Sequence, residues 1–485
     1  MLQSVICSRL EEHERGNVDG ANRIEPKFDN RGRDRNMSEA QEVIVVGAGV
    51  AGLAAAVRLA EAGLSVLILE ARDRIGGRVY PKQVPGLDAP VELGAEFIHG
   101  KSAEVWGQLR QHGVELTEVE GDAWCASEQG LGPCDFFSEV EEILERMDDS
   151  FEDESFLSFL NRCFPDTENK PKLKEAKRDA IRYVSGFNAA DPALVSVHWL
   201  VQESRAEEET EGDRAFRSKN GYQDLLDIYE AKMKSLKIEL RINTVVEAID
   251  WAKSPVELRA RSDGDVDTSS ARCVLITVPL GVLKAGSAQI GSIHFSPPLP
   301  PEKCSAIEKM EMGKVIRIVL RFRERFWDAL RPNGKKTLAE MSFLFSDDEL
   351  LPTWWTTNPN KYPIVTGWAP FKSAEQLSGH DLSFLKANAV KTFARLLGIR
   401  RETVEDSLLD AYSHDWQSDP FSRGAYSYGK VDCDGAPEAI GAPIYDRLFF
   451  AGEATDVTGN NGTVHGAIAS GERAAKEILR SREAL

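Results

Sequence analysis

Residues 42–78 read EVIVVGAGVAGLAAAVRLAEAGLSVLILEARDRIGGR, and this stretch decides the fold of the chain. It opens with the β-branched run Val43–Val46, which is typical of a strand buried in a parallel sheet. Three glycines in a G-x-G-x-x-G pattern come next, namely Gly47, Gly49 and Gly52. The first permits a tight turn, the second lets the backbone approach a pyrophosphate, and the third lets the following helix pack against the strand.

An acidic residue completes this unit. The Ala- and Leu-rich residues 53–62 predict a helix that ends at Gly63, and its N-terminus offers free N–H groups to phosphates. A second buried strand, Ser65–Leu69, leads to Glu70. A carboxylate there accepts hydrogen bonds from a ribose diol and repels a 2′-phosphate. The unit therefore predicts a site for the ADP half of FAD or NAD, and not of NADP.

The residues that follow the acid favour FAD over NAD. The segment Asp73–Arg78 contains the pair Gly76-Gly77 followed by Arg78. It resembles the extended flavin fingerprint of the glutathione-reductase-like flavoproteins, where this segment lies against the FAD pyrophosphate. The resemblance implies a charge-assisted contact from Arg78 to a phosphate. An ordinary glycine turn with a surface arginine is the alternative interpretation.

The composition is that of an ordinary globular protein. A chain of 485 residues suffices for two or three domains. Its 59 Lys and Arg residues against 78 Asp and Glu residues give a net charge of −19, which argues against nucleic acid as a partner. Such a charge would steer cationic ligands, although it also serves solubility alone. No apolar run reaches the roughly 18 residues of a membrane span, so we expect none.

The cysteines and histidines show no ligand spacing. The seven cysteines are odd in number and scattered, and none forms a C-x-x-C pair, so we expect neither a disulfide framework nor a zinc site. The eight histidines lack an H-x-x-x-H pattern, and we expect no metal. A reducing, cytoplasmic setting fits this cysteine usage best.

Strands of the nucleotide-binding type recur far apart in the chain, at Cys273–Val278 and Arg447–Ala451. The simplest account is an FAD-binding domain built from three pieces, 41–100, 220–285 and 425–485. The insertions 101–219 and 286–424 would then form a substrate domain. Residues 1–40 are polar and densely charged, so we expect a disordered tail, with Met37 as an alternative start.

The predicted fold class follows from these pieces. It is α/β, with a Rossmann-like, glutathione-reductase-like FAD-binding domain and a second α+β substrate domain formed by the insertions. Apolar spacing within the insertions predicts helices at Val140–Met147 and Lys172–Val184. The same insertions contain two strand-like runs, Ile316–Phe322 and Val365–Trp368.

The C-terminal residues 448–479 read LFFAGEATDVTGNNGTVHGAIASGERAAKEIL. Thr463 stands at an N-cap position, and small or apolar residues from Val464 onward follow a period of 3.6, so we expect a helix there. Three further segments matter: ELGAEFIHG (Glu92–Gly100), TVPLGVL (Thr277–Leu283) and WQSDPFSRGAYS (Trp416–Ser427). Together the chain resembles, over residues 41–480, the flavin-containing amine oxidase family, with GTVHGA and GAEFIHG nearest the polyamine oxidase branch.

The resemblance implies the cofactor contacts. The glycine turn, Glu70 and the Gly-Gly-Arg segment would hold the ADP portion, Val246 would contact adenine through its backbone, and Glu453 would meet the ribityl chain. The amide of Val464 would face the flavin pyrimidine and stabilise negative charge there. The full set of implied FAD ligands is Gly47, Gly49, Gly52, Glu70, Ala71, Arg72, Gly76, Gly77, Arg78, Val246, Glu453, Thr463 and Val464. Position 425 is alanine, where monoamine oxidases carry the flavin-bonding cysteine, so FAD should be held non-covalently.

The resemblance also implies the walls of the substrate cavity. Trp416 and Tyr426 would stand beside the flavin, where aromatic faces attract an amine cation and orient it. Plain core packing is the alternative for both. His99 would line the cavity and bind a substrate nitrogen or a proton, with a structural histidine as the alternative. Thr463 matches the polyamine oxidases, where monoamine oxidases have a second tyrosine.

Arg317 departs from the family. Relatives have a lysine at this position of the strand, where it holds a water near flavin N5, and Lys314 would face the other side of the strand. Arginine is always charged and donates in a planar fork. It would either order water or bind a substrate carboxylate in a bidentate manner.

The predicted function is FAD-dependent oxidation of an amine C–N bond by hydride transfer to the flavin. Molecular oxygen would accept the electrons and give hydrogen peroxide, and the imine would hydrolyse. The expected partners are thus a small amine and O2, while the sequence carries no signal for an oligomeric state. The alternatives are another flavin oxidoreductase, such as an L-amino-acid oxidase or a desaturase-like enzyme acting on an acidic or apolar substrate, and a non-catalytic flavin-binding module.

Overall fold

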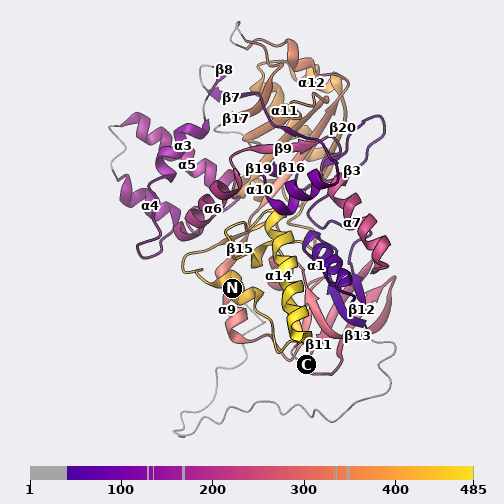
Figure 1. Ribbon diagram of the computed structural model, residues 1–485. Helices are drawn as coiled ribbons and strands as arrows, with labels where there is room; N and C mark the ends of the chain where they lie inside the picture. The colour runs from indigo at the N-terminus through magenta and orange to yellow at the C-terminus, as the bar shows by residue number, and fades with distance from the viewer. Residues whose placement is uncertain are drawn as a thin grey trace.

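A computed structural model describes residues 41–483, apart from 128–129, 135, 166–169, 333, 335 and 347–349. The expected N-terminal tail, residues 1–40 with Met37, lies outside the described residues. Two large sheets, each with its own helices, make up most of the rest (Figure 1). This architecture confirms the predicted α/β class.

The first sheet contains the predicted nucleotide-binding strands. Its order is β10-β2-β1-β13-β12-β11-β14, and β22 also pairs with β13. β1 runs parallel to β2 and β13, whereas β12 is antiparallel to both its neighbours. The strands are β1 (Gln41–Val46), β2 (Val66–Leu69), β10 (Glu239–Arg241), β11 (Thr244–Asp250), β12 (Val256–Ser262), β13 (Asp265–Ile276), β14 (His294–Ser296) and β22 (Leu448–Phe450).

The two faces of β1 explain why its run of apolar residues is continuous. Val43 and Val45 pack on one side with α1 and α14, while Ile44 and Val46 pack on the other with strand residues from β11 to β13. A strand covered on both faces needs apolar residues at every position. The covering helices are α1 (Val50–Glu61), α7 (Gln223–Leu236) and α14 (Val464–Glu483).

Helices α1 and α14 lie side by side (Figure 1). Gly471 of α14 faces the backbone of α1 so closely that an added Cβ would stand 2.2 Å from the carbonyl oxygen of Ala51. A glycine is therefore required at this crossing. The contact joins the first and the last helix of the described chain into one layer on the sheet.

The second sheet comes from the insertions. Its order is β20-β16-β19-β18-β17-β7-β8, and all pairs are antiparallel except β17 with β7. The strands are β7 (Asp122–Ser127), β8 (Gly130–Pro133), β16 (Val315–Phe322), β17 (Met341–Ser346), β18 (Thr353–Thr356), β19 (Ile364–Pro370) and β20 (Leu408–Ser413). Helices α10 (Phe371–Leu377), α11 (Leu382–Leu396) and α12 (Arg401–Ser407) accompany it.

Four helices of the described chain between β8 and β9 form a lobe beside the second sheet (Figure 1), and they are α3 (Phe136–Leu144), α4 (Phe156–Cys163), α5 (Pro171–Gly186) and α6 (Val197–Thr210). The small strands are β3 (Pro81–Lys82), β4 (Val91–Glu92), β5 (Ile98–His99), β6 (Leu116–Glu118), β9 (Ala215–Ser218), β15 (Met310–Met312) and β21 (Ser427–Gly429). The short helices are η1 (Ala103–Gly107), α2 (Gln108–Gln111), α8 (Leu280–Leu283), α9 (Pro301–Lys309), η2 (Phe326–Ala329), α13 (Ala436–Gly441) and η3 (Glu453–Thr455).

Each helix or strand predicted in the insertions overlaps an observed one, although α3 begins four residues before the predicted range 140–147 and ends three residues before that range does. The expected helices at 140–147 and 172–184 correspond to α3 and α5, and the expected strands at 316–322 and 365–368 correspond to β16 and β19. The domain boundaries themselves stay a prediction. The strand β14 belongs to the first sheet although it lies beyond residue 285.

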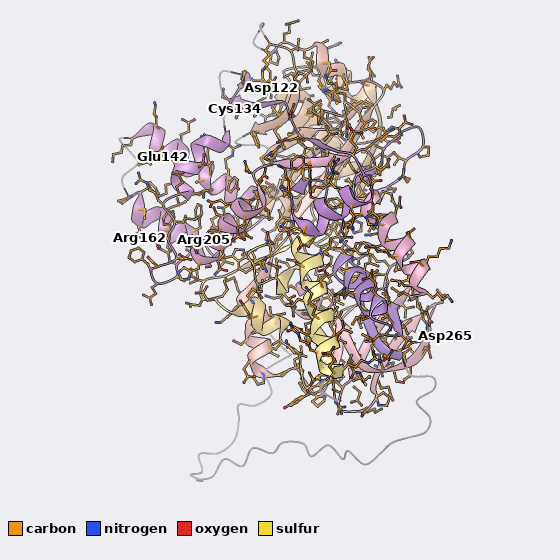
Figure 2. All side chains as sticks on the ribbon, viewed as in Figure 1. Asp122, Cys134, Glu142, Arg162, Arg205 and Asp265 are labelled. Atoms are coloured by element: carbon orange, nitrogen blue, oxygen red, sulfur yellow. A yellow bond between two sulfur atoms is a disulfide. The ribbon has the colours of Figure 1, made fainter. Side chains whose placement is uncertain are left out.

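A disulfide bond joins Cys125 to Cys134. Cys125 lies on β7, and Cys134 follows β8 in the same hairpin, where its N–H donates to the carbonyl of Ala123 (Figure 2 labels Cys134). This bond departs from the expectation drawn from the scattered cysteines, because the hairpin brings together two residues that share no sequence motif. Cys163, Cys273 and Cys433 are free thiols.

None of the helices in the described part of the chain combines the length and the apolar character of a membrane span.

Candidate active site

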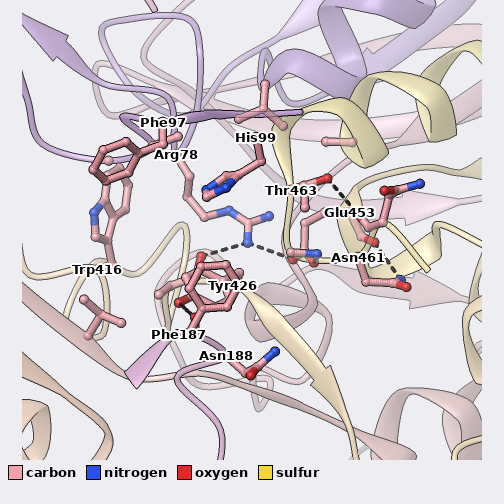
Figure 3. A pocket seen from close by; sticks show the side chains of 18 of the residues that line it. Arg78, Phe97, His99, Phe187, Asn188, Trp416, Tyr426, Glu453, Asn461 and Thr463 are labelled. Atoms are coloured by element: carbon pink, nitrogen blue, oxygen red, sulfur yellow. Dashed lines mark hydrogen bonds and ion pairs between the residues drawn. The ribbon is translucent and has the colours of Figure 1, made fainter. Parts of the chain in front are cut away.

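A cavity of about 1700 Å³ reaches from the first sheet to the second. Its lining includes the glycine turn after β1, the start of α14, the strands β16 to β19 and the face of α6. Figure 3 shows part of this lining, with aromatic side chains on one side and the Glu453 region on the other. Most of the residues that the sequence singled out meet here.

The glycine turn fits a pyrophosphate. Gly47 has a φ of +106°, which favours glycine. No atom lies within 4 Å of the place where a Cβ on Gly49 would stand, so the backbone there is open to the cavity. A Cβ on Gly52, by contrast, would stand 2.1 Å from the carbonyl oxygen of Gly47. The three glycines therefore have the local geometry that their spacing predicted, the contact of Gly49 with a pyrophosphate stays a prediction, and α1 begins directly behind them at Val50.

Glu70 lies at the end of β2, where it is buried but borders the cavity. Its carboxylate accepts hydrogen bonds from the backbone N–H of Ala48 at 2.7 Å and of Arg72 at 2.8 Å. Each carboxylate oxygen can accept more than one hydrogen bond, so the capacity for a ribose diol remains. Glu70 also holds the glycine turn in place, a structural role that the sequence did not reveal.

The Gly-Gly-Arg segment packs on the glycine turn. The N–H of Gly76 donates to the carbonyl of Ala48, and Gly77, with a φ of +61°, stands so that a Cβ would lie 3.2 Å from the Cα of Gly49. Ala71 and Arg72 also line the cavity, and Arg72 pairs with Asp419 at 2.8 Å. On the opposite strand β11, Val246 is buried and lines the same space.

Arg78 and Glu453 meet across the cavity. Nη1 of Arg78 donates to Oε1 of Glu453 at 2.8 Å and to the carbonyl of Ala425 at 3.0 Å (Figure 3). The second oxygen of Glu453 accepts from the hydroxyl of Ser427 at 2.6 Å and from the N–H of Gly462 at 2.9 Å. The structure thus brings the predicted pyrophosphate and ribityl ligands into one polar cluster.

The start of α14 is capped as the sequence predicted. The hydroxyl of Thr463 accepts the N–H of Gly466 at 2.9 Å, and Val464 is the first residue of the helix. Both Thr463 and Val464 line the cavity. The free N–H groups of this helix end therefore face the same space as the glycine turn.

Trp416 and Tyr426 both lie on the cavity wall (Figure 3). The indole of Trp416 donates to the carbonyl of Leu93 at 2.9 Å, and the hydroxyl of Tyr426 donates to the carbonyl of Phe187 at 2.5 Å. Gly462 stands against the Tyr426 ring, where a Cβ would lie 3.4 Å away. Each ring is fixed at its polar edge, and the guanidinium groups of Arg72 and Arg74 each lie 5.9 Å from the centroid of the Trp416 ring.

His99 lines the cavity with its ring edge to Phe187, at 5.8 Å between ring centroids. Burial lowers the pKa of His99 to about 4, and burial with the neighbouring His99 lowers the pKa of His465 to about 4. Both imidazoles are thus neutral at pH 7. Neither imidazole therefore adds a positive charge that would repel a cationic ligand in the cavity.

Arg317 of β16 reaches the cavity wall from inside the second sheet. Its Nη1 donates to the carbonyl of Gly94 at 2.5 Å, and its Nη2 pairs with Glu96. Burial lowers the pKa of Arg317 to about 10, so the guanidinium remains charged at pH 7. The sequence left two roles open for Arg317, ordering a water and binding a substrate carboxylate. In the structure both of its terminal nitrogens already bond to groups of the protein.

Two cavity carboxylates escaped the sequence analysis. Glu203 and Glu207 lie one turn apart on α6, within an acidic run that reads as a solvated helix face. The carboxylate of Glu203 accepts from the indole of Trp199 at 2.8 Å and from the amide of Asn188 at 2.7 Å. Burial raises the pKa of Glu203 to about 8 and that of Glu207 to about 7. The sequence signal that could have found this pair is the spacing of four residues, which places Glu203 and Glu207 on one face of a helix.

A nucleotide-binding sheet, a second sheet and a cavity that reaches from one to the other are the architecture of a dinucleotide-binding protein with two domains. The sequence model of the flavin containing amine oxidoreductase family matches residues 50–131 and 130–479. The chain belongs to this family. The assignment confirms the predicted resemblance, the flavin cofactor and the class of enzyme.

The chain is similar to curated proteins of two kinds. It is 30% identical to lysine-specific histone demethylase 1 homolog 2 of Arabidopsis thaliana, over 90% of this chain and 58% of that protein. It is 29% identical to polyamine oxidase 2 of Arabidopsis thaliana, over 92% of this chain and 89% of that protein. The chain thus spans little more than half the length of the first of these relatives.

Solved structures establish the fold. The chain superimposes on putrescine oxidase bound to putrescine with a TM-score of 0.73 and 21% identity, over 91% of this chain and 99% of that one. Cyclohexylamine oxidase from Brevibacterium oxydans IH-35A gives a TM-score of 0.72 and 20% identity, over 92% and 100% of the two chains. The predicted fold class, a nucleotide-binding domain with a second domain, is therefore the fold of these two oxidases.

Proposed function

We propose that the chain is an FAD-dependent amine oxidase that converts an amine and O2 into an imine and H2O2, after which water hydrolyses the imine. One observation carries the proposal: a single cavity joins the pyrophosphate-fitting glycine turn to a chamber walled by aromatic rings and carboxylates. When bound, the flavin accepts a hydride from the carbon beside the amine nitrogen. The protein binds, orients and shields the substrate.

The aromatic wall would orient the amine. The faces of Trp416 and Tyr426 attract a cation, and their polar edges are held by backbone carbonyls, so the rings are fixed before the ligand arrives. Further rings extend the wall: Tyr183 stacks on Phe187 at 5.3 Å, and Phe97 lies 5.6 Å from Trp355. These rings exclude water from the reacting carbon, which protects the imine until it is released.

The carboxylates would attract the ammonium form of the substrate. Glu203 and Glu207 border the cavity, and a cation beside them lowers their raised pKa values towards the ordinary range. The neutral His99 and His465 do not oppose that cation. The chamber is thus matched to an amine in charge as well as in shape.

A peroxide-release screen over monoamines, polyamines and amino acids tests the function. We expect peroxide with at least one amine, and anaerobic addition of that amine should bleach the flavin absorbance. Bleaching without peroxide in air would replace O2 by another electron acceptor. A flavin-loaded protein that no amine bleaches would refute the proposed oxidation.

A cytoplasmic setting, inferred from cysteine usage, is part of the proposal. The Cys125–Cys134 bond is the observation against it, since cytosolic thiols are usually kept reduced. Thiol titration of protein that was alkylated during lysis decides the question. Two additional reactive thiols after reduction would place the folded protein in an oxidising compartment.

A further inference from the structure

We propose that Glu96 determines substrate specificity: by neutralising Arg317 on the cavity wall, it excludes amines that carry a carboxylate beside the reacting carbon. The inference rests on the proposed amine oxidation and adds to it the class of amine that the site rejects. It also assigns a role to Arg317 that differs from both roles expected from the sequence.

The two terminal nitrogens of Arg317 both bond to groups of the protein, while its buried Nε has no hydrogen-bond partner among the described residues. Its side chain is 4% exposed, its Nη1 donates to the carbonyl of Gly94, and its Nη2 pairs with Glu96. The guanidinium also lies 5.3 Å from the centroid of the Trp355 ring. A substrate carboxylate needs two parallel N–H donors for bidentate binding. Both terminal nitrogens are occupied by groups of the protein itself.

Glu96 is held from three directions. It pairs with Arg317 of β16, with Nη2 of Arg217 of β9 at 2.7 Å, and with the indole N–H of Trp355 of β18 at 2.9 Å. Its side chain is 9% exposed and still borders the cavity. An internal carboxylate therefore occupies the position in which a substrate carboxylate would meet Arg317.

The pair lies beside the aromatic wall that would hold the amine. Gly94, whose carbonyl accepts from Arg317, is packed against Trp416, since a Cβ on Gly94 would stand 3.3 Å from the indole ring. The preceding carbonyl, that of Leu93, accepts from the same indole. The segment 93–96 thus fixes Trp416 and neutralises Arg317 together, which places the charge pair next to the proposed amine position.

Two guanidinium groups, those of Arg217 and Arg317, meet Glu96, and Glu92 lies nearby. Glu92, Arg217 and Arg317 are buried, Glu96 is 9% exposed, and burial raises the pKa of Glu92 to about 7 although it accepts the N–H of Tyr222 at 2.7 Å. A substrate carboxylate entering this region loses its hydration and gains no net attraction, while Glu96 repels it. Removal of the Glu96 charge leaves two guanidinium groups with Glu92 alone. That change converts a rejecting wall into one that attracts an anion.

Glu96→Gln tests the inference in the flavin-loaded enzyme. We expect the ratio of kcat/KM for 2-phenylethylamine to that for L-phenylalanine to fall at least tenfold, because the two substrates differ only by the carboxylate. Calorimetric titration with phenylacetate, a carboxylate probe that needs no turnover, should show at least tenfold tighter binding in the variant. Glu96→Asp keeps the charge and should retain the wild-type ratio.

Glu340→Gln is the matched control. Glu340 is exposed and pairs with Lys361 at 2.7 Å, outside the cavity lining, so the same chemical change there should alter neither measurement. The double variant Glu96→Gln/Arg317→Met should lose the gained phenylacetate binding, because the remaining guanidinium, that of Arg217, lies outside the cavity lining and is held by the carbonyls of Thr356 and Asn358. Persistence of that binding would show that Arg317 is not its source.

The wild-type enzyme provides a test that requires no substitution. It should prefer 2-phenylethylamine to L-phenylalanine by at least 100-fold, and comparable use of both would overturn the inference. A folded Glu96→Gln variant with unchanged substrate ratio and unchanged phenylacetate binding would overturn it as well. Failure of every amine to bleach the flavin would instead refute the proposed oxidation, and the phenylacetate titration would still judge Glu96.

Discussion

Replacing Glu203 by glutamine should make the enzyme more stable, relative to wild type, as the pH rises. The carboxylate lies in the cavity wall, where it accepts hydrogen bonds from Trp199 and Asn188, and burial raises its pKa to about 8. Glutamine keeps the size of the side chain and an oxygen that accepts hydrogen bonds. The substitution thus removes chiefly the ability to ionise.

The size of the effect follows from proton linkage. The pKa of Glu203 is 4.5 in its reference state and about 8 in the folded protein, so between these values the folded state binds a proton that the unfolded state lacks. Folding stability therefore decreases by about 1.4 kcal/mol per pH unit in this window. Between pH 5.5 and 7.5 the loss is roughly 2.5 kcal/mol. The Glu203→Gln variant does not show this loss of stability, because its side chain does not ionise.

Thermal melting of both holoenzymes at pH 5.5 and 7.5 measures this effect. The difference in Tm between the variant and the wild type should shift by a few degrees in favour of the variant at the higher pH. Glu209→Gln, an exposed change on the same helix α6, should show an equal difference at both pH values. A Glu203→Gln difference that is also independent of pH would refute the buried, proton-binding carboxylate.

Four further predictions concern the cofactor site. Gly49→Ala should keep the Tm of the apoprotein, since the φ of −67° and ψ of 167° at this position suit alanine and no atom lies within 4 Å of the added Cβ. Flavin retention on gel filtration should nevertheless fall. Full retention would mean that the backbone there does not face the pyrophosphate. Gly52→Ala should instead lower the Tm itself, because its Cβ would collide with the turn. Glu70→Ala should lower the flavin content after dialysis, because two hydrogen bonds to a charged acceptor are worth roughly 1.5–3 kcal/mol each. An unchanged flavin content would exclude Glu70 as a ribose ligand. Acid or heat should release all the flavin into the supernatant, because Ala425 offers no sulfur for a covalent bond; flavin that stays with the precipitate would contradict this.

The fold was predictable wherever a local pattern determines the structure. The β-branched run at Val43–Val46 and the three glycines lie within one short unit and have the local geometry that their spacing predicted, whereas the ribose contact of Glu70 stays a prediction. Thr463 caps its helix as expected, because an N-cap depends only on the next three residues. These features need no knowledge of the rest of the chain.

The electrostatics of the cavity were not predictable in the same way. Arg317 and Glu96 are 221 residues apart, and only the packing of β16 against the segment 93–96 makes them partners. Glu203 and Glu207 sit in a run of acids whose other members are mostly exposed, so burial had to be seen in the tertiary structure. Cys125 and Cys134 likewise meet only because a hairpin forms between them.

The ion pair between Arg78 and Glu453 has a consequence for biosynthesis. The two residues are 375 positions apart, so a ribosome adding about 5–20 residues per second needs roughly 20–75 seconds to travel from one to the other. Throughout that interval the nascent chain carries the glycine turn without the helix α14 that lies against α1. Cofactor capture is therefore a late event, and a chain that stalls before residue 453 leaves a half-built pocket exposed to chaperones and proteases.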